Sequence, residues 1–340
     1  MLSCTTILLL LLILFRSTSF YLNFRITKNC FGQALPETLR FCNSAYPEQK
    51  SYAPNRFPFQ NFTIMQFTDS LIYYEILTLF AVISIAEFFT GLYKSEKWSK
   101  NEWYINFAGL FLSSTITRPI SFLLTSYILN FFFADYFNFF SSVPLWLGVI
   151  ITCLLEDFTQ YWWHRAAHTY TWLWKAHRVH HTAPEMSVFL TGRNSWIYLL
   201  LFPSRIVSTV LVFLGFGQAF LIGYFFKALI GISAHSSVRW DKPLYAVKWL
   251  HPVMWIVERT ISTPATHHAH HAATDADGIG VINGNYGNMF FIWDMIFGTA
   301  KITREFSEHI GLEDYHEEPW YVQLGYPVFK SKDSRSELSE

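Results

Sequence analysis

Residues 164–181 constrain this chain more than any other stretch, because they are crowded with histidine. The stretch reads HRAAHTYTWLWKAHRVHH, and its histidines are His164, His168, His177, His180 and His181. Of these, His177, His180 and His181 are separated by three residues and then by one. A second cluster, HHAHH, has the same spacing at His267, His270 and His271. Side chains three or four residues apart lie on one face of an α-helix, so each group can direct its imidazoles at a common point.

Metal binding is the chemistry that these groups favour. Neutral imidazole is a good ligand for iron, zinc and copper. A single His-x3-His pair is more often chance or surface decoration than a metal site, but here the repeats are confined to two short stretches beside apolar runs. Eight imidazoles exceed the four ligands that a structural zinc ion takes. The sequence therefore predicts two metal ions.

The composition indicates an integral membrane protein. Of 340 residues, 51% are hydrophobic and 15% are charged, whereas soluble domains carry about a quarter charged residues. Apolar runs near the length of a membrane span predict an all-α fold, a polytopic transmembrane helical bundle. The formal net charge is zero, so nothing indicates nucleic-acid binding. The four cysteines form no CxxC motif, and the metal chemistry rests on histidine.

The histidine groups and their surroundings resemble the fatty acid hydroxylase / sterol desaturase superfamily of membrane-bound di-iron oxygenases. The matching motifs are HRAAH, HRVHH and HHAHH, with DFTQYWW at 157–163, LWKA at 173–176, Thr263-Pro264, Asn285-Tyr286-Gly287 and the stretch from Ile292-Trp293-Asp294 to Phe297-Gly298-Thr299. The resemblance covers roughly residues 70–320. The spacing is closest to the branch that contains alkylglycerol monooxygenase and many bacterial sterol-desaturase-like proteins.

The resemblance implies a lipid hydroxylase that holds two iron ions at a cytosolic histidine-box cap, uses O2 and oxidises a C–H bond of a lipid. The two electrons must come from an external donor, because the sequence shows no flavin or nicotinamide motif; cytochrome b5 or a reduced pterin would serve. An all-histidine site differs from the soluble carboxylate bundle, which needs Glu-x-x-His pairs. Desaturation and ether cleavage through a hydroxylated intermediate share the same site.

A further ligand is expected at His235. This residue follows an apolar hairpin, where an unpaired imidazole would be costly, and family members have a site histidine in this region. The alternative is a histidine hydrogen-bonded in the core. His268 lies on the wrong helical face for a ligand and is expected to support the site from outside. His251, His309 and His316 are isolated and are not expected to bind metal.

Two aspartates are expected to orient ligand histidines. Asp157 precedes His164 by seven residues, so it shares that helical face and can accept the second N–H of an imidazole. Asp294 is a weaker candidate for the same role, with a structural turn before Phe297-Gly298 as the alternative.

The chain divides by composition into four parts. They are residues 1–16, a signal peptide or signal anchor; 17–70, a loop-rich lumenal segment; 71–320, the catalytic domain; and 321–340, a polar, mobile tail. The basic loop at Lys94, Lys97 and Lys100 places the histidine boxes on the cytosolic side, in the endoplasmic reticulum. Asn61 is then available for glycosylation, and Cys30 and Cys42 can pair.

Spans are expected at residues 71–93, 104–136, 143–160 and 196–230. Glu75 and Glu87 interrupt the first and are expected near the membrane interface. The second is broken at Arg118-Pro119, either as an interfacial helix followed by a span or as one kinked span with a snorkelling arginine. The fourth should be a hairpin whose tip is Gly215-Phe216-Gly217.

Two other classes of protein compete with the enzyme. A histidine-rich metal transporter would carry its ligands in the middle of the spans, whereas these histidines lie beyond the apolar runs. A catalytically inactive scaffold would have broken boxes, and the boxes here are intact.

Overall fold

The computed structural model describes residues 59–94 and 96–329. The predicted signal segment, most of the 17–70 segment and the Cys30–Cys42 pair lie outside the described residues. The predicted boundary at residue 70 is too late, because helix α2 (Phe59–Thr90) begins twelve residues before residue 71. The sequence explains this extension: no proline or glycine follows Pro58 until Gly91, where a positive φ of 81° ends the helix.

The regular elements of the described residues are helices, apart from two isolated β-bridges, as the all-α expectation requires. Two helical stretches among these residues, Lys100–Phe132 and Trp196–His235, are long and apolar enough to cross a membrane. Exposed aromatic side chains on the first stretch, such as Tyr127 and Phe131, fit a lipid environment better than water. The composition and these helices together identify a membrane protein.

The stretch from Lys100 to Phe132 is one continuous helical path. It comprises α3 (Lys100–Phe111), the π-helical segment η2 (Leu112–Thr117) and α4 (Arg118–Phe132). The π segment precedes Pro119, whose ring disturbs the helical hydrogen bonding of the preceding turn. Of the two expectations, the structure therefore matches a single kinked stretch. Arg118 does not simply extend to an interface, because it donates a hydrogen bond to the Tyr224 hydroxyl at 2.7 Å.

The predicted hairpin is confirmed. Its elements are α7 (Trp196–Leu200), α8 (Pro203–Leu211), the π-helical η5 (Val212–Phe216) and α9 (Gly217–His235). The chain reverses at Gly215, whose φ is 107° and where a Cβ would lie 2.9 Å from the Ser141 nitrogen, so glycine is required. Lys227 on the returning limb donates to Ser204 on the first limb at 2.7 Å.

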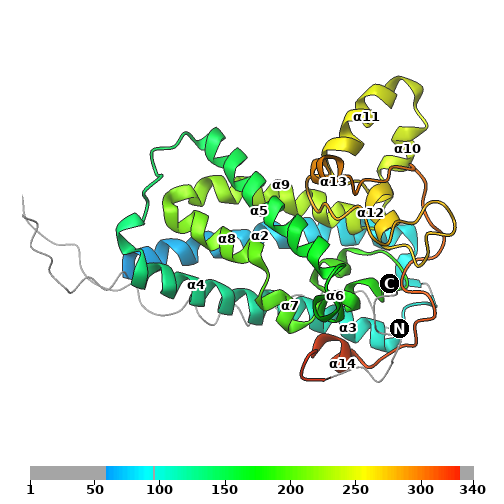
Figure 1. Ribbon diagram of the computed structural model, residues 1–340, viewed down its shortest axis with the longest axis horizontal. Coiled ribbons are helices and arrows are strands. Elements are labelled where there is room, and N and C mark those ends of the chain that lie inside the picture. Colours follow the sequence, from blue (N-terminus) through cyan, green and yellow to red (C-terminus); the bar gives the residue numbers. More distant parts are fainter. Residues whose placement is uncertain (1–58, 95, 330–340) are drawn as a thin grey trace, which may run out of the picture. The chain divides into compact units, whose positions relative to one another are not determined.

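Helix α5 (Leu145–Ala167) packs against both α8 and α9 (Figure 1). Helix α2 packs against α9, and α4 against α8. A buried ion pair joins α5 to α9, with Lys227 Nζ 3.3 Å from Glu156. Because α5 ends at the first histidine box and α9 ends at His235, the bundle brings both to the same end.

Shorter elements cover that end of the bundle (Figure 1). They are η1 (Leu92–Lys94), α6 (Thr171–His181), η4 (Val188–Gly192), α10 (Asp241–Tyr245), η6 (Lys248–Leu250), α11 (His251–Thr260), α12 (Pro264–His270), α13 (Ile292–Phe297) and α14 (Trp320–Leu324). A last short element, η3 (Ala134–Tyr136), follows α4.

The predicted mobile tail begins too early at residue 321. Helix α14 packs against α3 and α6, and Leu324 joins an apolar cluster with Ile105 and Val179. The Thr182 hydroxyl donates to Gln323 at 2.8 Å. These residues are held because WYVQL is mostly apolar and buries two of its side chains. Residues 330–340 lie outside the described residues.

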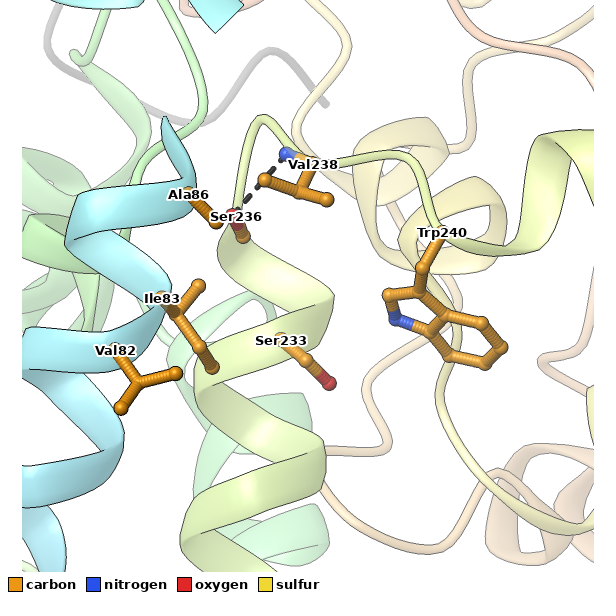
Figure 2. Close-up of a pocket in the computed structure, with 7 residues that line it drawn as sticks. All are labelled: Val82, Ile83, Ala86, Ser233, Ser236, Val238 and Trp240. Carbon is orange, nitrogen blue, oxygen red and sulfur yellow. Dashed lines mark hydrogen bonds between the residues drawn. The ribbon is translucent and has the colours of Figure 1, made fainter. Parts of the chain in front are cut away.

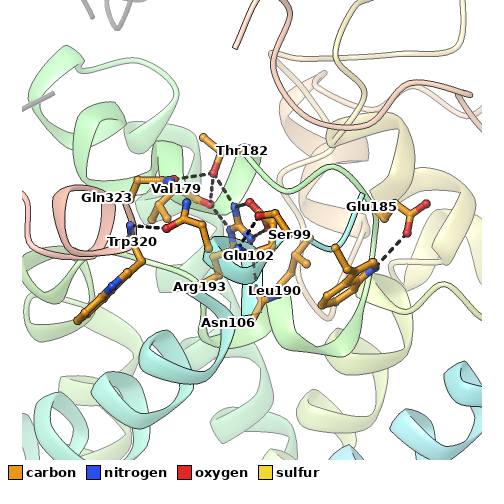
Figure 3. Close-up of polar contacts among 12 residues, drawn as sticks. Ser99, Glu102, Asn106, Val179, Thr182, Glu185, Leu190, Arg193, Trp320 and Gln323 are labelled. Carbon is orange, nitrogen blue, oxygen red and sulfur yellow. Dashed lines mark hydrogen bonds and ion pairs between the residues drawn. The ribbon is translucent and has the colours of Figure 1, made fainter. Parts of the chain in front are cut away.

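A fully buried arginine joins the helical bundle to the histidine-bearing helix α6 (Figure 3). Arg193 donates to the Val179 carbonyl at 2.6 Å and to the Thr182 hydroxyl at 2.8 Å, both at the end of α6. Its guanidinium also forms an ion pair with Glu102 on α3. A buried charge of this kind requires its partner, so the pair locks α6 onto α3.

Replacing Arg193 by Met should destabilise the protein by about 3–5 kcal/mol, because Glu102 would remain buried without its cation. The measurement is thermal unfolding of the purified full-length protein. Lys248→Met, at an exposed site, is the matched control and should leave the unfolding temperature unchanged. Equal unfolding temperatures for Arg193→Met and the unmodified protein would contradict this role.

Candidate metal centre

Eight histidines converge in two groups at the end of the bundle. The first group is His164, His168, His181 and His270, and the second is His180, His235, His267 and His271. All eight are buried, and the ligand atoms within each group lie within 4.8 Å of one another. Each group draws on three elements of the fold, so neither exists in any single sequence motif.

Local structure aims the third box at the centre. Helix α12 starts at Thr263, where the Thr263 and Thr266 side chains form a capping box and Pro264 occupies the first turn. This fixed start sets which face the following imidazoles share. His267 and His271 then belong to the second group and His270 to the first, although all three lie within five residues.

The orientation of four imidazoles is set by backbone carbonyls. In each, Nδ1 lies at hydrogen-bonding distance from a carbonyl oxygen: His164 to Tyr286 at 2.8 Å, His180 to Leu190 at 3.0 Å, His235 to Gly231 at 2.6 Å and His270 to Gly284 at 2.7 Å. A carbonyl only accepts, so Nδ1 carries the hydrogen and donates it. The neutral ring is then left with a lone pair on Nε2, which is the arrangement of a metal-bound histidine.

In two places, the Nε2 lone pairs of two different rings face each other. The Nε2 atoms of His164 and His270 are 3.0 Å apart in the first group, and those of His180 and His235 are 3.3 Å apart in the second. No hydrogen remains to lie between them, so the contacts are repulsive unless a cation is shared. Two nitrogens that bind one ion at about 2.1 Å and roughly a right angle lie about 3 Å apart. The donor set therefore fits one metal ion in each group.

The remaining members of the groups are also packed closely, or have ring nitrogens without a hydrogen-bond partner in the part of the chain described. His168 Nε2 lies 3.2 Å from His181 Nε2, and His267 Nε2 lies 2.9 Å from His235 Nε2. Both ring nitrogens of His271 are buried without a hydrogen-bond partner among the described residues. Burial also holds the pKa of His270 and His271 well below the ordinary value, so both rings are neutral at physiological pH, as a ligand must be.

His177 belongs to neither group but contacts both. Its ring centroid is 4.9 Å from that of His164 and 5.0 Å from that of His180. Its Nδ1 donates to Asn194 Oδ1 at 2.8 Å, which leaves Nε2 as a buried lone pair with no partner among the described atoms. The sequence-predicted ligand set of nine thus lies together, with His177 as the ninth member.

The structure corrects the expected role of Asp157. Its carboxylate contacts no histidine in the described part of the chain, but accepts from the Met289 and Phe290 backbone nitrogens at 2.9 and 2.8 Å and from the Trp293 indole at 3.1 Å. The loop after the third box covers this face of α5 and supplies these donors. Asp157 therefore anchors the loop, and backbone carbonyls take the role that the sequence assigned to it.

Asp294 and His268 lie outside the two groups. Asp294 accepts from the backbone nitrogens of Tyr286 and Gly287 at 2.8 and 2.7 Å, so it holds the peptide whose carbonyl orients His164. It also accepts a hydrogen bond from the Thr299 hydroxyl. This contact belongs to the structural turn that was expected as the alternative role of Asp294.

His268 turns toward Ser236, with its Nε2 donating to the Ser236 carbonyl at 3.1 Å. His251, His309 and His316 are exposed and belong to neither group.

Sequence reasoning missed the polar residues that support the boxes. Glu87, expected at an interface, is fully buried and accepts from the Val188 nitrogen at 3.0 Å and the Ser236 hydroxyl at 2.8 Å. It thereby joins the segment after the second box to the residue after His235. The rule that carboxylates in apolar segments are often functional pointed to Glu87; no local pattern marked Asn194.

A cleft of about 120 Å3 lies beside the metal centre but is separate from it. It is lined by α2, the last turn of α9 and Trp240 (Figure 2). Ser233 and Ser236 face the cleft, whereas His235 lies on another face of the same turn and meets the second group. The cleft is therefore not part of the histidine cluster.

Comparisons with known proteins bear on this centre. The fatty acid hydroxylase family model matches residues 149–299. Ornithine lipid hydroxylase OlsE of Rhizobium tropici is 29% identical over 57% of this chain and 54% of its own length. Human alkylglycerol monooxygenase is 28% identical over 44% of this chain, and very-long-chain aldehyde decarbonylase GL1-4 of Oryza sativa subsp. japonica is 25% identical over 54%. The chain spans 29% of each of these two relatives. No solved structure matches the chain.

Asn194→Ala should weaken metal binding by about 10- to 100-fold, the usual effect of removing the partner that orients a ligand histidine. Competition with a chelator measures the affinity. Asn194→Asp keeps an acceptor oxygen for His177 and should bind metal at least as tightly as the unmodified protein. An unchanged affinity in Asn194→Ala would show that His177 is not a ligand.

Acid should destabilise the metal-free protein. Burial holds the pKa of His267, His270 and His271 well below the ordinary value of 6.5, so they stay neutral in the folded state but take up protons in the unfolded chain. Stability is therefore complete above pH 6.5 and falls as the pH drops below it. Thermal unfolding of chelator-treated protein from about pH 8 to about pH 5 tests this, and a constant unfolding temperature would contradict it.

Proposed function

This chain belongs to the fatty acid hydroxylase family through residues 149–299, and from that premise we propose that it is a membrane-bound lipid monooxygenase. The substrate is a lipid such as a sterol, a fatty acyl chain or an ether lipid. The activities named for two similar proteins, ornithine lipid hydroxylase and alkylglycerol monooxygenase, support oxygenation of a lipid. In the balanced reaction, RH, O2, two electrons and two protons yield ROH and water.

The observation that carries this proposal is that, in each histidine group, the Nε2 lone pairs of two rings face each other. A cation in each group explains why eight imidazoles are buried together in this arrangement. The first group would hold one iron ion and the second group another, with His177 beside both. Bound iron would supply the activation of O2, using electrons from an external donor such as cytochrome b5 or a reduced pterin.

The protein's own contribution is to fix and enclose the ligands. Four backbone carbonyls hold the tautomer of their histidines, so none of these four imidazoles has to rotate or lose a proton when metal binds. Buried rings around the groups exclude bulk water: Trp174 packs 5.1 Å from His168, and Tyr198 stacks 4.8 Å from His177. Exclusion of water strengthens electrostatic interactions and protects reactive species.

The competing functions fit the arrangement less well. A transporter needs ligands along a path through the spans, whereas these histidines gather at the ends of α5 and α9. An inactive scaffold has no need for two complete ligand sets. Desaturation of a lipid uses the same ligands, and product analysis distinguishes it from hydroxylation.

We place the histidine boxes in the cytosol and the protein in the endoplasmic reticulum. The support is that the basic loop lies at the histidine end of the bundle: Lys97 pairs with Glu185 at 3.8 Å, four residues after the second box. Basic loops remain on the cytosolic side. A soluble or membrane-anchored electron donor would then reach the centre from the cytosol.

The decisive test combines metal analysis with turnover. Protein loaded with iron should contain two metal ions and convert a lipid mixture to products that are heavier by one oxygen, with matching O2 uptake. His235→Gln should lower metal content and abolish turnover, because it removes one ligand of the second group. His251→Gln, at an exposed histidine outside both groups, should be silent.

Two results would overturn the assignment. The first is full activity in protein that holds no more than one metal ion. The second is normal metal content and turnover in His235→Gln, which would make His235 a core histidine.

A further inference from the structure

Helix α11 presents an apolar face outward. Val253 and Ile256 on α11 are 53% and 58% exposed, and Trp249 on the preceding element η6 is 78% exposed. The opposite face is buried, with Met254 at 3% and Glu258 at 0% exposure. A helix of a water-soluble surface has the reverse pattern at such positions. The outward face of α11 therefore lacks a partner of its own polarity within the described residues.

The helix is held firmly in this position. It packs mainly against α10, η6 and α13, and these elements extend away from the core of the bundle (Figure 1). Its one buried carboxylate, Glu258, accepts from Arg304 at 2.7 and 2.8 Å and from Arg259 at 2.6 Å. The exposure of the apolar face is thus a built feature.

The apolar surface continues from α11 to the bundle. On α13, Ile292, Met295 and Ile296 are exposed. The next residue, Phe297, packs 5.0 Å from Trp162, which is itself exposed on α5. Farther along α5 the outward side chains remain apolar, including Leu155 and Ile150. A path of exposed apolar side chains therefore joins α11 to the outer face of the bundle.

The exposed charged side chains around α11 are all basic. In residues 239–260 the exposed charged side chains are Arg239, Lys242 and Lys248. Both acidic residues of the segment are buried: Asp241 accepts from the Ala265 nitrogen at 2.8 Å, and Glu258 is in its ion pairs. Arg259 lies over the Trp255 ring at 4.3 Å. Aromatic and aliphatic side chains next to basic ones are typical of a helix that lies in a membrane interface.

We propose that residues 239–260 and α13, the interfacial unit, bind an anionic lipid surface. Trp249, Val253, Ile256 and the exposed residues of α13 enter the boundary between headgroups and acyl chains, and the basic side chains bind anionic headgroups. The unit encloses the third histidine box in sequence, since α12 lies between α11 and α13. The histidine cap is thereby held against the bilayer by more than the spanning helices. The inference goes beyond the proposed oxygenation and does not depend on it.

Depth measurements on the full-length protein in liposomes test the proposal. The cysteines are replaced by serine, and a nitroxide is attached at Ile256→Cys or, as the control, at Glu308→Cys, an exposed polar site. In phosphatidylcholine liposomes with phosphatidylserine, the label at 256 should collide several-fold more often with O2, which concentrates in the acyl region, than with a water-soluble nickel complex. The label at 308 should show the opposite preference.

Two outcomes at position 256 would overturn the proposal. Preferential collision with the nickel complex would place α11 in water. A label shielded from both reagents and broadened by a neighbouring spin would show that a second copy of the chain covers this face.

The charge component has its own test. Removing phosphatidylserine should make the label at 256 shallower, and Lys242→Gln with Lys248→Gln should weaken that lipid dependence, because only Arg239 remains of the three exposed basic side chains. Metal content should stay unchanged in the double variant, because neither lysine lies in the histidine groups, and this shows that the fold is intact. A depth that does not respond to phosphatidylserine in the unmodified protein would refute the binding of anionic lipid.

Discussion

The mutual repulsion of buried imidazole lone pairs is the constraint on which this structure depends. Neutral rings whose Nε2 atoms face each other about 3 Å apart are unstable by themselves, and a cation converts the repulsion into ligation. The surrounding fold keeps the rings from turning away. It does so with four carbonyl oxygens from three separate segments, so the geometry of the centre is a property of the backbone.

Buried charged groups connect that centre to the helical bundle. Arg193 ties α6 to α3 through Glu102, and Glu87 ties α2 to the segments beside both His180 and His235. Lys227 and Glu156 join α5 to α9 below the boxes. An unpaired charge at any of these places would be costly, so each pair favours one arrangement of the helices. The bundle and the histidine cap consequently form one mechanical unit.

The surface of the protein complements this interior. Apolar side chains cover the outer faces of α4 and α5 and continue over α13 to α11. The two charged residues of α11, Glu258 and Arg259, are satisfied within the protein or over an aromatic ring. The two histidine groups lie at one end of this apolar bundle.

The sequence by itself determined the chemistry of this protein, because histidines at helical spacing and long apolar runs are local signals. They predicted two metal sites, the helical fold and the hairpin at Gly215 without any knowledge of tertiary contacts. Local spacing also led to an error at Asp157, since a shared helical face does not reveal which loop covers that face. The packing of α14 was missed for a related reason: this short segment becomes ordered only through its neighbours.

The tertiary structure alone decided how the histidines are divided. Adjacent residues such as His180 and His181 belong to different groups, because their rings leave α6 in different directions and meet different helices. The choice of backbone carbonyls as hydrogen-bond acceptors, and of Asn194 for His177, depends on loops that approach from distant parts of the chain. Sequence spacing specifies which side chains can share a face; long-range packing specifies what they meet there.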